Sequence, residues 1–315
     1  MARILLFGQA QFGHKVFEEL LARGHEVTAV CPPPDVPGRS VDPLKTAALE
    51  KGVRVVQRRS WRGVDAAAEV DAASADLGVL AYVTQIVPSQ VLDAPRCGSI
   101  CFHPSLLPAW RGGSAINWQI IEGCRTGGIT LFRPDDGIDE GPVYLQKELT
   151  IGPDDTAGSF YYGKVFDAGV AATVECAELV LSGNARGVAQ DESLATYEPL
   201  CRDEHACVDW GRSVRQVHDL IRGCDPSPGA HARFGDEIVR LYGSRIVSRR
   251  DGAASGTVTA ISDAGVEVAV AGGSVLLAKL GVAGRKVAAA EGAASLGLHV
   301  GSSFACGRMP SRSAN

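Results

Sequence analysis

Short apolar runs alternate with helix-like segments through the first 135 residues, and this alternation leaves few folds open to the chain. The run Ile4–Phe7 is followed by an amphipathic stretch at 15–23, with Val16, Phe17 and Leu20 on one face. Further apolar runs of strand length occur at 26–30, 53–56, 77–81, 98–102 and 128–132. Strand, helix and strand in this order predict an α/β domain with a Rossmann-like, open, mostly parallel sheet.

The second half of the chain shows a different pattern. Residues 156–181 form a long helical stretch, whereas 183–204 are polar, rich in turn residues and without periodicity. Beyond them, closely spaced short strands predict a smaller C-terminal β-barrel of the oligonucleotide-fold type. We therefore expect a catalytic domain at 1–185, a linker at 186–204, a barrel domain at 205–306 and a frayed tail at 307–315.

Charge, hydropathy and cysteine usage exclude several classes of protein. The formal net charge of −5 provides no overall attraction to nucleic acid. No apolar run approaches the roughly 18 residues that span a bilayer, and the first residues lack the pattern of a signal peptide. We therefore expect a cytoplasmic protein with no membrane partner. The 9 cysteines include no Cys-x-x-Cys pair, so neither a zinc site nor a disulfide framework is predicted.

The segment from Gly8 to Gly13 invites a nucleotide-binding interpretation, because it follows a strand and opens a helix. Its spacing is Gly-x4-Gly rather than G-x-G-x-x-G, and no Lys-Ser or Lys-Thr pair follows. Cys31 and three prolines also stand where a dinucleotide site would place its ribose-binding acid. The sequence favours a tight strand-to-helix turn without a nicotinamide cofactor.

Two later loops carry the candidate chemistry. His103 ends one apolar run and is followed by Pro104 and Pro108, which stiffen the chain beyond it. The loop at 133–141 follows another apolar run and ends in Asp139, Glu140 and Gly141. Because open α/β sheets place ligands at the carboxyl ends of their strands, we expect the two loops to meet at the same end of one sheet. A carboxylate beside an imidazole would suit proton transfer or stabilisation of an oxyanion.

Each loop also has a plainer interpretation when taken alone. A single histidine after a strand can be a satisfied structural residue, and an acidic loop containing glycine can be a solvated turn. The loop lacks the D-x-[DN]-x-[DN]-G pattern of a calcium site, so no metal is predicted there. The two signals together are what favour a catalytic pair.

Three motifs resemble the signature of enzymes that use 10-formyltetrahydrofolate: His103-Pro-Ser-Leu-Leu-Pro108, Arg111-Gly112 and Asp136-Gly-Ile-Asp139-x-Gly141. That family includes methionyl-tRNA formyltransferase, formyltransferases of amino sugars and hydroxyornithine, and the hydrolase domain of 10-formyltetrahydrofolate dehydrogenase. Gly8-Gln9, Phe12-Gly13 and Ser114–Trp118 add detailed similarity to the hydrolase domain. Segments 195–197, 208–210 and 221–223 are similar to the start of the family's C-terminal domain.

The resemblance implies that His103 and Asp139 are the catalytic pair, with 10-formyltetrahydrofolate as co-substrate and no metal. It also implies that the backbone around 80–87 and the loop at 135–139 wrap the pterin. Members usually carry Asn at the place of Cys101, whose thiol is a weak donor. We therefore expect oxyanion stabilisation or support of the pair from Cys101, Gln85 and Ser105. The cofactor-binding residues implied are Leu80, Tyr82, Val87, Arg111, Asp135, Asp136, Gly137 and Ile138.

The formyl acceptor is not fixed by these motifs. The tRNA enzyme normally carries lysines before its C-terminal domain, whereas 197–204 here hold one arginine and three acids, which disfavours tRNA as a partner. We expect a small-molecule amine or hydroxylamine as acceptor, such as N-hydroxyornithine in siderophore biosynthesis. Hydrolysis of 10-formyltetrahydrofolate, formylation of methionyl-tRNA and folate binding without turnover stay open. The oligomeric state also stays open, with a homodimer among the states considered.

Overall fold

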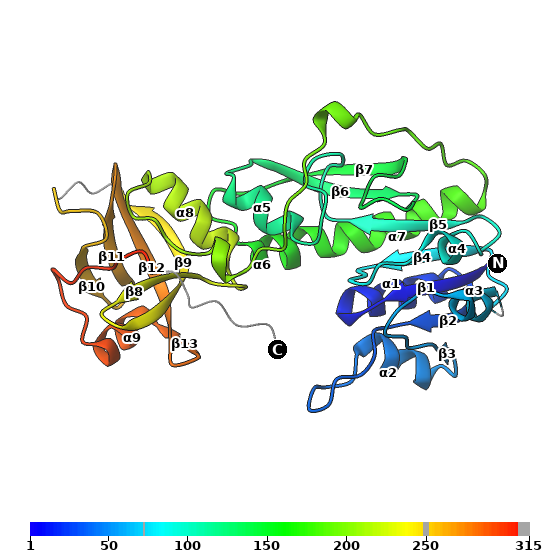
Figure 1. Ribbon diagram of the computed structural model, residues 1–315, viewed down its shortest axis with the longest axis horizontal. Helices are drawn as coiled ribbons and strands as arrows, with labels where there is room; N and C mark the ends of the chain where they lie inside the picture. Colours follow the sequence, from blue (N-terminus) through cyan, green and yellow to red (C-terminus); the bar gives the residue numbers. More distant parts are fainter. Residues whose placement is uncertain (72, 248–251, 308–315) are drawn as a thin grey trace. The chain divides into compact units, whose positions relative to one another are not determined.

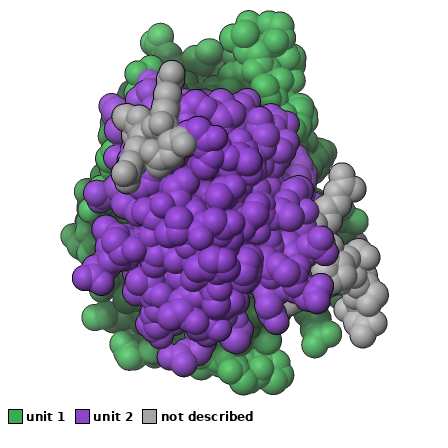
Figure 2. Space-filling view, turned by 90° about the vertical axis from the view of Figure 1, so that its left-hand side faces the viewer, with its two compact units in different colours: residues 1–113, 128–149, 162–198 green, residues 114–127, 150–161, 199–315 purple. Residues whose placement is uncertain are grey.

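The computed structural model describes residues 1–71, 73–247 and 252–307, and the chain divides into two compact units (Figure 2). Unit 1 comprises residues 1–113, 128–149 and 162–198; unit 2 comprises 114–127, 150–161 and 199–315. The predicted boundaries at residues 185, 204 and 306 stay predictions. Of the predicted tail, residues 308–315 lie outside the described part of the chain.

Unit 1 is built on a sheet whose strand order is β3-β2-β1-β4-β5-β6-β7 (Figure 1). The pairs from β3 to β5 are parallel, and β6 runs antiparallel to β5. The order reverses between β1 and β4, as in doubly wound folds. The prediction of a Rossmann-like, mostly parallel sheet is therefore confirmed. The strands are β1 (Arg3–Gly8), β2 (Glu26–Cys31), β3 (Arg54–Val55), β4 (Leu77–Ala81), β5 (Ser99–His103), β6 (Thr126–Phe132) and β7 (Val143–Thr150).

Helices cover this sheet because their apolar residues recur at helical spacing. In α1 (Ala10–Ala22) the buried residues are Phe12, Gly13, Val16, Phe17 and Leu20. The helix packs on α7 (Phe166–Leu181), which also contacts β4 and β5 (Figure 1). The remaining helices of unit 1 are α2 (Pro43–Glu50), α3 (Val64–Asp71), α4 (Ser89–Leu92) and the 3-10 helix Glu192–Leu194.

The predicted glycine turn between β1 and α1 is tight. A Cβ atom added to Gly8 would lie 2.9 Å from the carbonyl oxygen of Ala81, so no larger residue fits without a shift. Asp42 fixes the turn from outside, since its carboxylate accepts from the backbone N–H of Ala10 at 2.8 Å and from that of Leu44 at 2.9 Å. The same side chain thus caps α2 and holds the first residue of α1.

Unit 2 contains an antiparallel sheet in the order β10-β11-β12-β9-β8, with β13 paired to β12. Two antiparallel bridges join its edges to the last described residues: Ser303 pairs with Thr257, just before β10, and Ala305 pairs with Arg233 in β8. These bridges close the sheet and confirm the predicted C-terminal barrel. The strands are β8 (Ala230–Phe234), β9 (Glu237–Val247), β10 (Val258–Ser262), β11 (Gly265–Val270), β12 (Gly273–Val282) and β13 (Arg285–Ala288).

Helices of unit 2 contribute buried residues to the core of the barrel. A capping box between Ser213 and Gln216 starts α8 (Val214–Gly223), and Val217 and Ile221 enter the core. Arg222 is buried on the same helix, pairs with Asp219 at 2.7 Å and donates to the carbonyl of Asp155 at 2.9 Å. The other helical segments of this unit are α5 (Ala115–Ile121), α6 (Ala157–Phe160), the 3-10 helix Asp203–His205 and α9 (Ala289–Leu296), and a π-helix, Tyr161–Val165, begins at its last residue before unit 1. None of the helices in the described residues is long and apolar enough to cross a membrane.

Candidate functional site

β5 delivers His103 into a nearly closed environment, with 5% of the residue exposed. Its Nε2 lies 2.8 Å from the carbonyl oxygen of Trp110, which can only accept, so this nitrogen carries the proton. Its Nδ1 lies 3.4 Å from Oδ2 of Asp139, as an ion-pair contact longer than a good hydrogen bond. The structure thus brings together the two residues predicted to form a pair, and an acceptor faces each ring nitrogen.

Asp139 is held in place by bonds to both its side chain and its backbone. Its Oδ2 accepts from the backbone N–H of Gly112 at 2.9 Å, and its carbonyl accepts from Nε2 of Gln190 at 2.8 Å. The residue has a positive φ of 58°, which is sparsely populated by residues other than glycine. The side chain therefore faces His103 through a backbone conformation that the surrounding bonds maintain.

The reason we expected for this pairing is wrong. Because β6 is antiparallel to β5, Thr130 lies opposite His103 and Phe132 lies opposite Cys101. The loop after β6 therefore begins beside the amino-terminal half of β5, not at the strand end that carries His103. The pair forms because this loop folds back, closed at its base by the bond from the N–H of Arg133 to the carbonyl of Pro142 at 2.9 Å.

The prediction that Arg111 binds the cofactor is contradicted by its surroundings. The side chain is fully buried, and all five of its N–H donors are used within unit 1. Nε and Nη2 donate to Oε1 of Gln190 at 3.2 and 2.8 Å, and Nη1 and Nη2 donate to Glu192 at 2.9 and 2.7 Å. The last donor meets the hydroxyl of Tyr197 at 2.5 Å. The bond to Glu192 holds the pKa of Arg111 above its usual range, so the guanidinium is a permanent internal cation.

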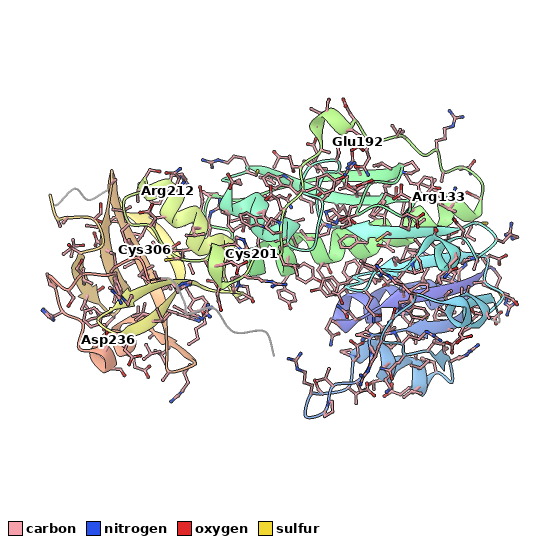
Figure 3. The ribbon with its side chains drawn as sticks, in the orientation of Figure 1. Arg133, Glu192, Cys201, Arg212, Asp236 and Cys306 are labelled. Atoms are coloured by element: carbon pink, nitrogen blue, oxygen red, sulfur yellow. The ribbon has the colours of Figure 1, made fainter. Side chains whose placement is uncertain are left out.

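Gln190 joins this cation to the loop that carries Asp139. While its Oε1 accepts from Arg111, its Nε2 donates to the carbonyls of Asp139 and Gly141, both at 2.8 Å. Further along, Thr196 receives the backbone N–H groups of Trp110 and Arg111 on its hydroxyl and carbonyl, at 2.8 and 2.9 Å. We call Arg111, Gln190, Glu192, Thr196 and Tyr197 the clamp (Glu192 is labelled in Figure 3). These contacts connect both loops of the candidate pair to residues 190–197, which the sequence predicted to lie in a linker.

Backbone strain gathers on the same loops. Six residues other than glycine have a positive φ in the described part of the chain, and four of them are Ala10, Tyr82, Trp110 and Asp139. Ala10 and Tyr82 lie within two residues of the ends of β1 and β4, whereas Trp110 and Asp139 lie seven residues beyond the ends of β5 and β6. Such conformations cost on the order of 1–2 kcal/mol each and persist where the surrounding structure enforces them, typically at functional sites.

Apart from Arg111 and from Leu80 in β4, the residues predicted to bind the cofactor lie on two segments that touch each other. The backbone N–H of Ser89 meets Oδ1 of Asp136 at 3.4 Å, and Oδ1 of Asp135 accepts from the N–H of Gly137 at 3.0 Å. Leu80 and Val87 are buried. Large apolar side chains are exposed on both loops: Tyr82 at 43%, Ile86 at 66% and Ile138 at 56%. These loops offer apolar surface next to carboxylates and backbone groups, and their role in binding stays a prediction.

Of the supporting candidates, Ser105 and Gln85 are committed to other partners. Ser105 is fully buried and its hydroxyl donates to the carbonyl of Ala109 at 2.7 Å. Gln85 donates to the carbonyl of Arg58 at 2.9 Å and accepts from the indole of Trp61 at 3.1 Å. These bonds fix neighbouring loops, and they leave neither group directed as an oxyanion donor.

Cys101 lies on β5 two residues before His103, and its side chain therefore faces the same side of the sheet. Burial raises the pKa of its thiol well above the usual range, and the charge of Asp139 adds to the effect. A thiol that stays protonated is a poor nucleophile. Among the described residues no group of three or more His, Cys, Asp or Glu side chains could hold a metal ion.

Comparison with known proteins gives the following matches. The Formyl transferase family matches residues 2–176, and the family described as Formyl transferase, C-terminal domain, matches residues 201–295. Cytosolic 10-formyltetrahydrofolate dehydrogenase of Xenopus tropicalis is 39% identical over 251 residues, which are 78% of this chain and 28% of that protein. Methionyl-tRNA formyltransferase of Geotalea daltonii is 33% identical over 289 residues, which are 90% of this chain and 92% of that protein.

Two solved structures share the fold. HypX from Aquifex aeolicus in complex with tetrahydrofolic acid has a TM-score of 0.69 at 22% identity, over 94% of this chain and 47% of that chain. WlaRD, a sugar 3N-formyl transferase, has a TM-score of 0.69 at 17% identity, over 88% and 97%. The chain therefore spans 28% of the Xenopus dehydrogenase and 47% of HypX, but nearly the whole of WlaRD and of the tRNA enzyme.

Proposed function

Because this chain belongs to the formyl transferase family, we propose that it transfers the formyl group of 10-formyltetrahydrofolate to an acceptor nitrogen. The observation that supports this most directly is the contact of His103 with Asp139 at 3.4 Å, on loops that carry strained backbone. The family predicted from the motifs is confirmed, while the residue roles and the acceptor are proposals.

In the proposed mechanism His103 and Asp139 handle the protons. As the acceptor nitrogen attacks, Nε2 of His103 would leave the carbonyl of Trp110, and it would then donate its N–H to the formyl oxygen or, when deprotonated, remove the acceptor's proton. Asp139 orients the imidazole, stabilises its charged form and relays the proton that the acceptor nitrogen loses to the departing folate nitrogen. The bond from the N–H of Gly112 keeps the carboxylate from turning away. The rate gain would come mainly from alignment and from a preorganised response to the developing oxyanion.

We propose that the pterin binds between the loops that carry Tyr82 and Ile138. The exposed apolar side chains there would cover its rings, and the carboxylates of Asp135 and Asp136 with nearby backbone carbonyls would meet its N–H groups. Arg111 has no part in this binding because its donors are already bonded inside the clamp.

For the acceptor we propose a small amine or hydroxylamine, such as N-hydroxyornithine or an amino sugar. Residues 197–204 carry three acids and one arginine, which does not suit the phosphates of a tRNA. Hydrolysis to formate is the second candidate. It is supported by the 39% identity to a 10-formyltetrahydrofolate dehydrogenase and by Cys101, which takes the place where members of the family usually have an asparagine donor.

The test is a mass-spectrometric screen for the gain of one carbonyl unit on amines, hydroxylamines, amino sugars and methionyl-tRNA, with 10-formyltetrahydrofolate as donor. We expect wild-type protein to formylate a small acceptor, and His103→Ala and Asp139→Asn to lose at least about a hundredfold in rate while keeping their fold. His299→Ala and Asp167→Asn, which change exposed residues of the same kind, are the controls.

Four results would change the proposal. Rapid release of formate without any acceptor identifies a hydrolase. Transfer to methionyl-tRNA alone replaces the small acceptor. Wild-type rates in His103→Ala or Asp139→Asn overturn the catalytic pair, and tight folate binding with no turnover on any acceptor leaves a folate-binding protein.

A further inference from the structure

In unit 2, two segments far apart in sequence share one edge of β8. Successive backbone groups of a strand point to alternate edges, and residues 231 and 233 of β8 face the edge away from β9. At this edge the backbone N–H of His231 donates to the carbonyl of Ala206 at 2.8 Å, and the carbonyl of His231 accepts from the N–H of Val208 at 2.9 Å. The backbone N–H of Arg233 donates to the carbonyl of Ala305 at 2.9 Å, and the N–H of Ala305 donates back to the carbonyl of Arg233 at 2.8 Å. Residues 206–208 and 303–306 therefore come together beside two positions of one strand.

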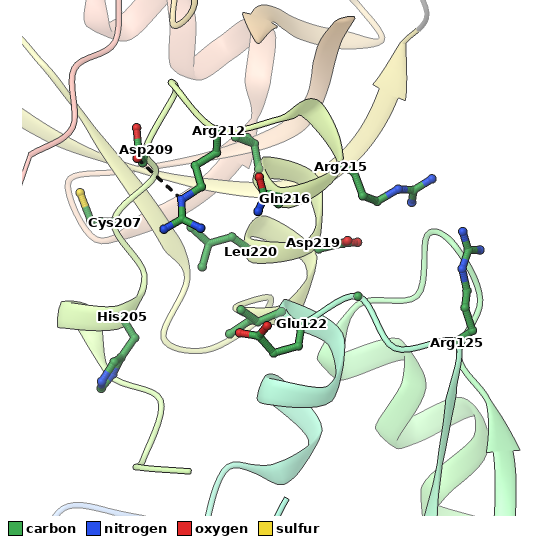
Figure 4. A pocket seen from close by; sticks show the side chains of 13 residues that line it. Glu122, Arg125, His205, Cys207, Asp209, Arg212, Arg215, Gln216, Asp219 and Leu220 are labelled. Carbon is green, nitrogen blue, oxygen red and sulfur yellow. Dashed lines mark ion pairs between the residues drawn. The ribbon is translucent and has the colours of Figure 1, made fainter. Parts of the chain in front are cut away.

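This arrangement places two cysteines against each other. Sγ of Cys207 lies 2.8 Å from Sγ of Cys306, so the sulfur atoms would need to approach by about a further 0.8 Å to reach the length of a disulfide. Cys306 is exposed and is labelled in Figure 3. Cys207 is half-buried and lines a cavity of about 520 Å³ with Asp209, Arg212 and Leu220 (Figure 4). Small oxidants can reach the pair from solvent and from this cavity.

We infer that Cys207 and Cys306 form a reversible redox site, at which a hydroperoxide joins the two residues in a disulfide. The hydroperoxide oxidises one thiol to a sulfenic acid and leaves as the alcohol, or as water from hydrogen peroxide. The second thiol then displaces water from the sulfenic sulfur, and the S–S bond forms. Together the two thiols lose two protons and two electrons. A dithiol reductant reverses the reaction by exchange.

The disulfide would stabilise the segment that closes the barrel. Ser303 and Ala305 join β8 to the residue preceding β10, and Cys306 follows them directly. A covalent bond to Cys207 would fasten this closing segment, and it would close a loop of about a hundred residues in the unfolded chain. We expect oxidation to raise the melting temperature of unit 2 by about 5 to 10 °C.

A second thiol pair in unit 2 provides an internal comparison. Cys224 is buried, and its hydrogen bond with Cys201 together with burial raises the pKa of its thiol far above the usual range. Such a thiol reacts slowly. The same bond lowers the pKa of Cys201, so the comparison between the two pairs rests on access: hydrogen peroxide should link Cys207 to Cys306 first because Cys306 is exposed, whereas Cys224 is buried.

The experiment treats the full chain with a small excess of hydrogen peroxide, alkylates the remaining thiols and maps the peptides by mass spectrometry. We expect a peptide pair joining Cys207 to Cys306 that disappears after dithiothreitol, and a matching rise and fall of the melting temperature. Cys207→Ser and Cys306→Ser should each abolish the thermal shift, whereas Cys97→Ser should keep it.

The inference is overturned if both cysteines are recovered alkylated under conditions that oxidise other thiols, or if they stop at sulfinic acid without linkage. A linked wild-type peptide with no thermal shift would also overturn the proposed fastening of the barrel. These readouts require no formyl transfer, so they stand apart from the proposed function. Should a serine variant fail to fold, oxidised and reduced wild-type protein still decide the question.

Discussion

Replacing Gln190 by alanine should weaken the contact between His103 and Asp139, although neither of these residues is changed. The amide of Gln190 is the link between the buried cation of Arg111 and the loop that carries Asp139. In Gln190→Ala, the carbonyls of Asp139 and Gly141 lose the donor that both now bond at 2.8 Å. The strained backbone conformation of Asp139, with its φ of 58°, would then be maintained by fewer hydrogen bonds.

The magnitude follows from the bonds that are removed. A net contribution of about 1 kcal/mol for each of the two backbone bonds makes the loop about 2 kcal/mol less stable in its present conformation. An equal rise in the activation barrier lowers kcat by about thirtyfold. The KM for 10-formyltetrahydrofolate should change by less than about threefold, because the exposed apolar side chains of Tyr82 and Ile138 stay in place.

A second variant tests the amide oxygen of Gln190, which accepts from Arg111, separately from the amide nitrogen, which donates to the loop. In Gln190→Glu the carboxylate still accepts from Arg111, but it has no N–H for the carbonyls of Asp139 and Gly141. We expect Gln190→Glu to lose as much kcat as Gln190→Ala while keeping a higher melting temperature. Gln57→Ala is the control, because Gln57 makes the same kind of bond, to the carbonyl of Pro33 at 2.6 Å, outside the candidate site.

Steady-state kinetics with 10-formyltetrahydrofolate and thermal melts are the assays. If both Gln190 variants keep kcat within twofold of wild type, the clamp does not position Asp139 and the reasoning is refuted. A parallel fall in kcat and melting temperature for all three variants would assign Gln190 a purely structural role. The signal of His103 in nitrogen NMR gives a readout that needs no turnover, since it should move in Gln190→Ala and stay fixed in Gln57→Ala.

Three further predictions concern single positions. Cys101→Ala should keep kcat within about threefold in the same assay, because burial raises the pKa of that thiol and it is neither a nucleophile nor a good donor; a loss of a hundredfold would contradict this. Arg111→Lys should lower the free energy of unfolding by about 2–4 kcal/mol in urea titrations, since an ammonium group cannot supply five donors. Burial lowers the pKa of His218 and His231 in the folded protein, so the unfolded chain binds more protons than the folded one as the pH falls. The free energy of unfolding should therefore be highest above about pH 6.5 and should decrease as the pH falls below that value. Melting temperatures between pH 8 and pH 5 test this, and His231→Gln should flatten the decline.

Apolar runs were sufficient to predict six of the seven strands in the sheet of unit 1, whereas β7, β8 and β13 were not predicted. The apolar runs at 77–81 and 98–102 became β4 and β5, because a parallel strand covered on both faces needs an unbroken apolar run. The strands after residue 237 were predicted from their turns, and the structure places glycines with a positive φ at several turns between them, including Gly272 and Gly284; the turn predicted after residue 242 is absent, because Gly243 lies within β9.

Strand direction and the clamp were beyond the reach of the sequence pattern. The run at 126–132 looks the same whether β6 runs parallel or antiparallel to β5, since direction depends on the path of the connection and not on composition. Residues 186–204 have no periodicity because Gln190, Glu192 and Thr196 each bond through their own side chains, and the regular structure around them is limited to the short 3-10 helices Glu192–Leu194 and Asp203–His205. The similarity of Ala195-Thr-Tyr197 to the family was the one signal that this stretch carries more than a connection.

The clamp also explains how the site can keep strained residues in an otherwise relaxed fold. Trp110 and Asp139 both have a positive φ, and each is bonded to residues of the clamp: Trp110 through Thr196, and Asp139 through Gln190. Arg111 itself is buried, so the loss of its partner Gln190 would leave N–H donors of a buried cation unsatisfied, whereas Glu192 and Tyr197 are exposed to solvent. The ring of His103 therefore lies between the carbonyl of Trp110 and the carboxylate of Asp139, and the clamp bonds the first of these residues through Thr196 and the second through Gln190.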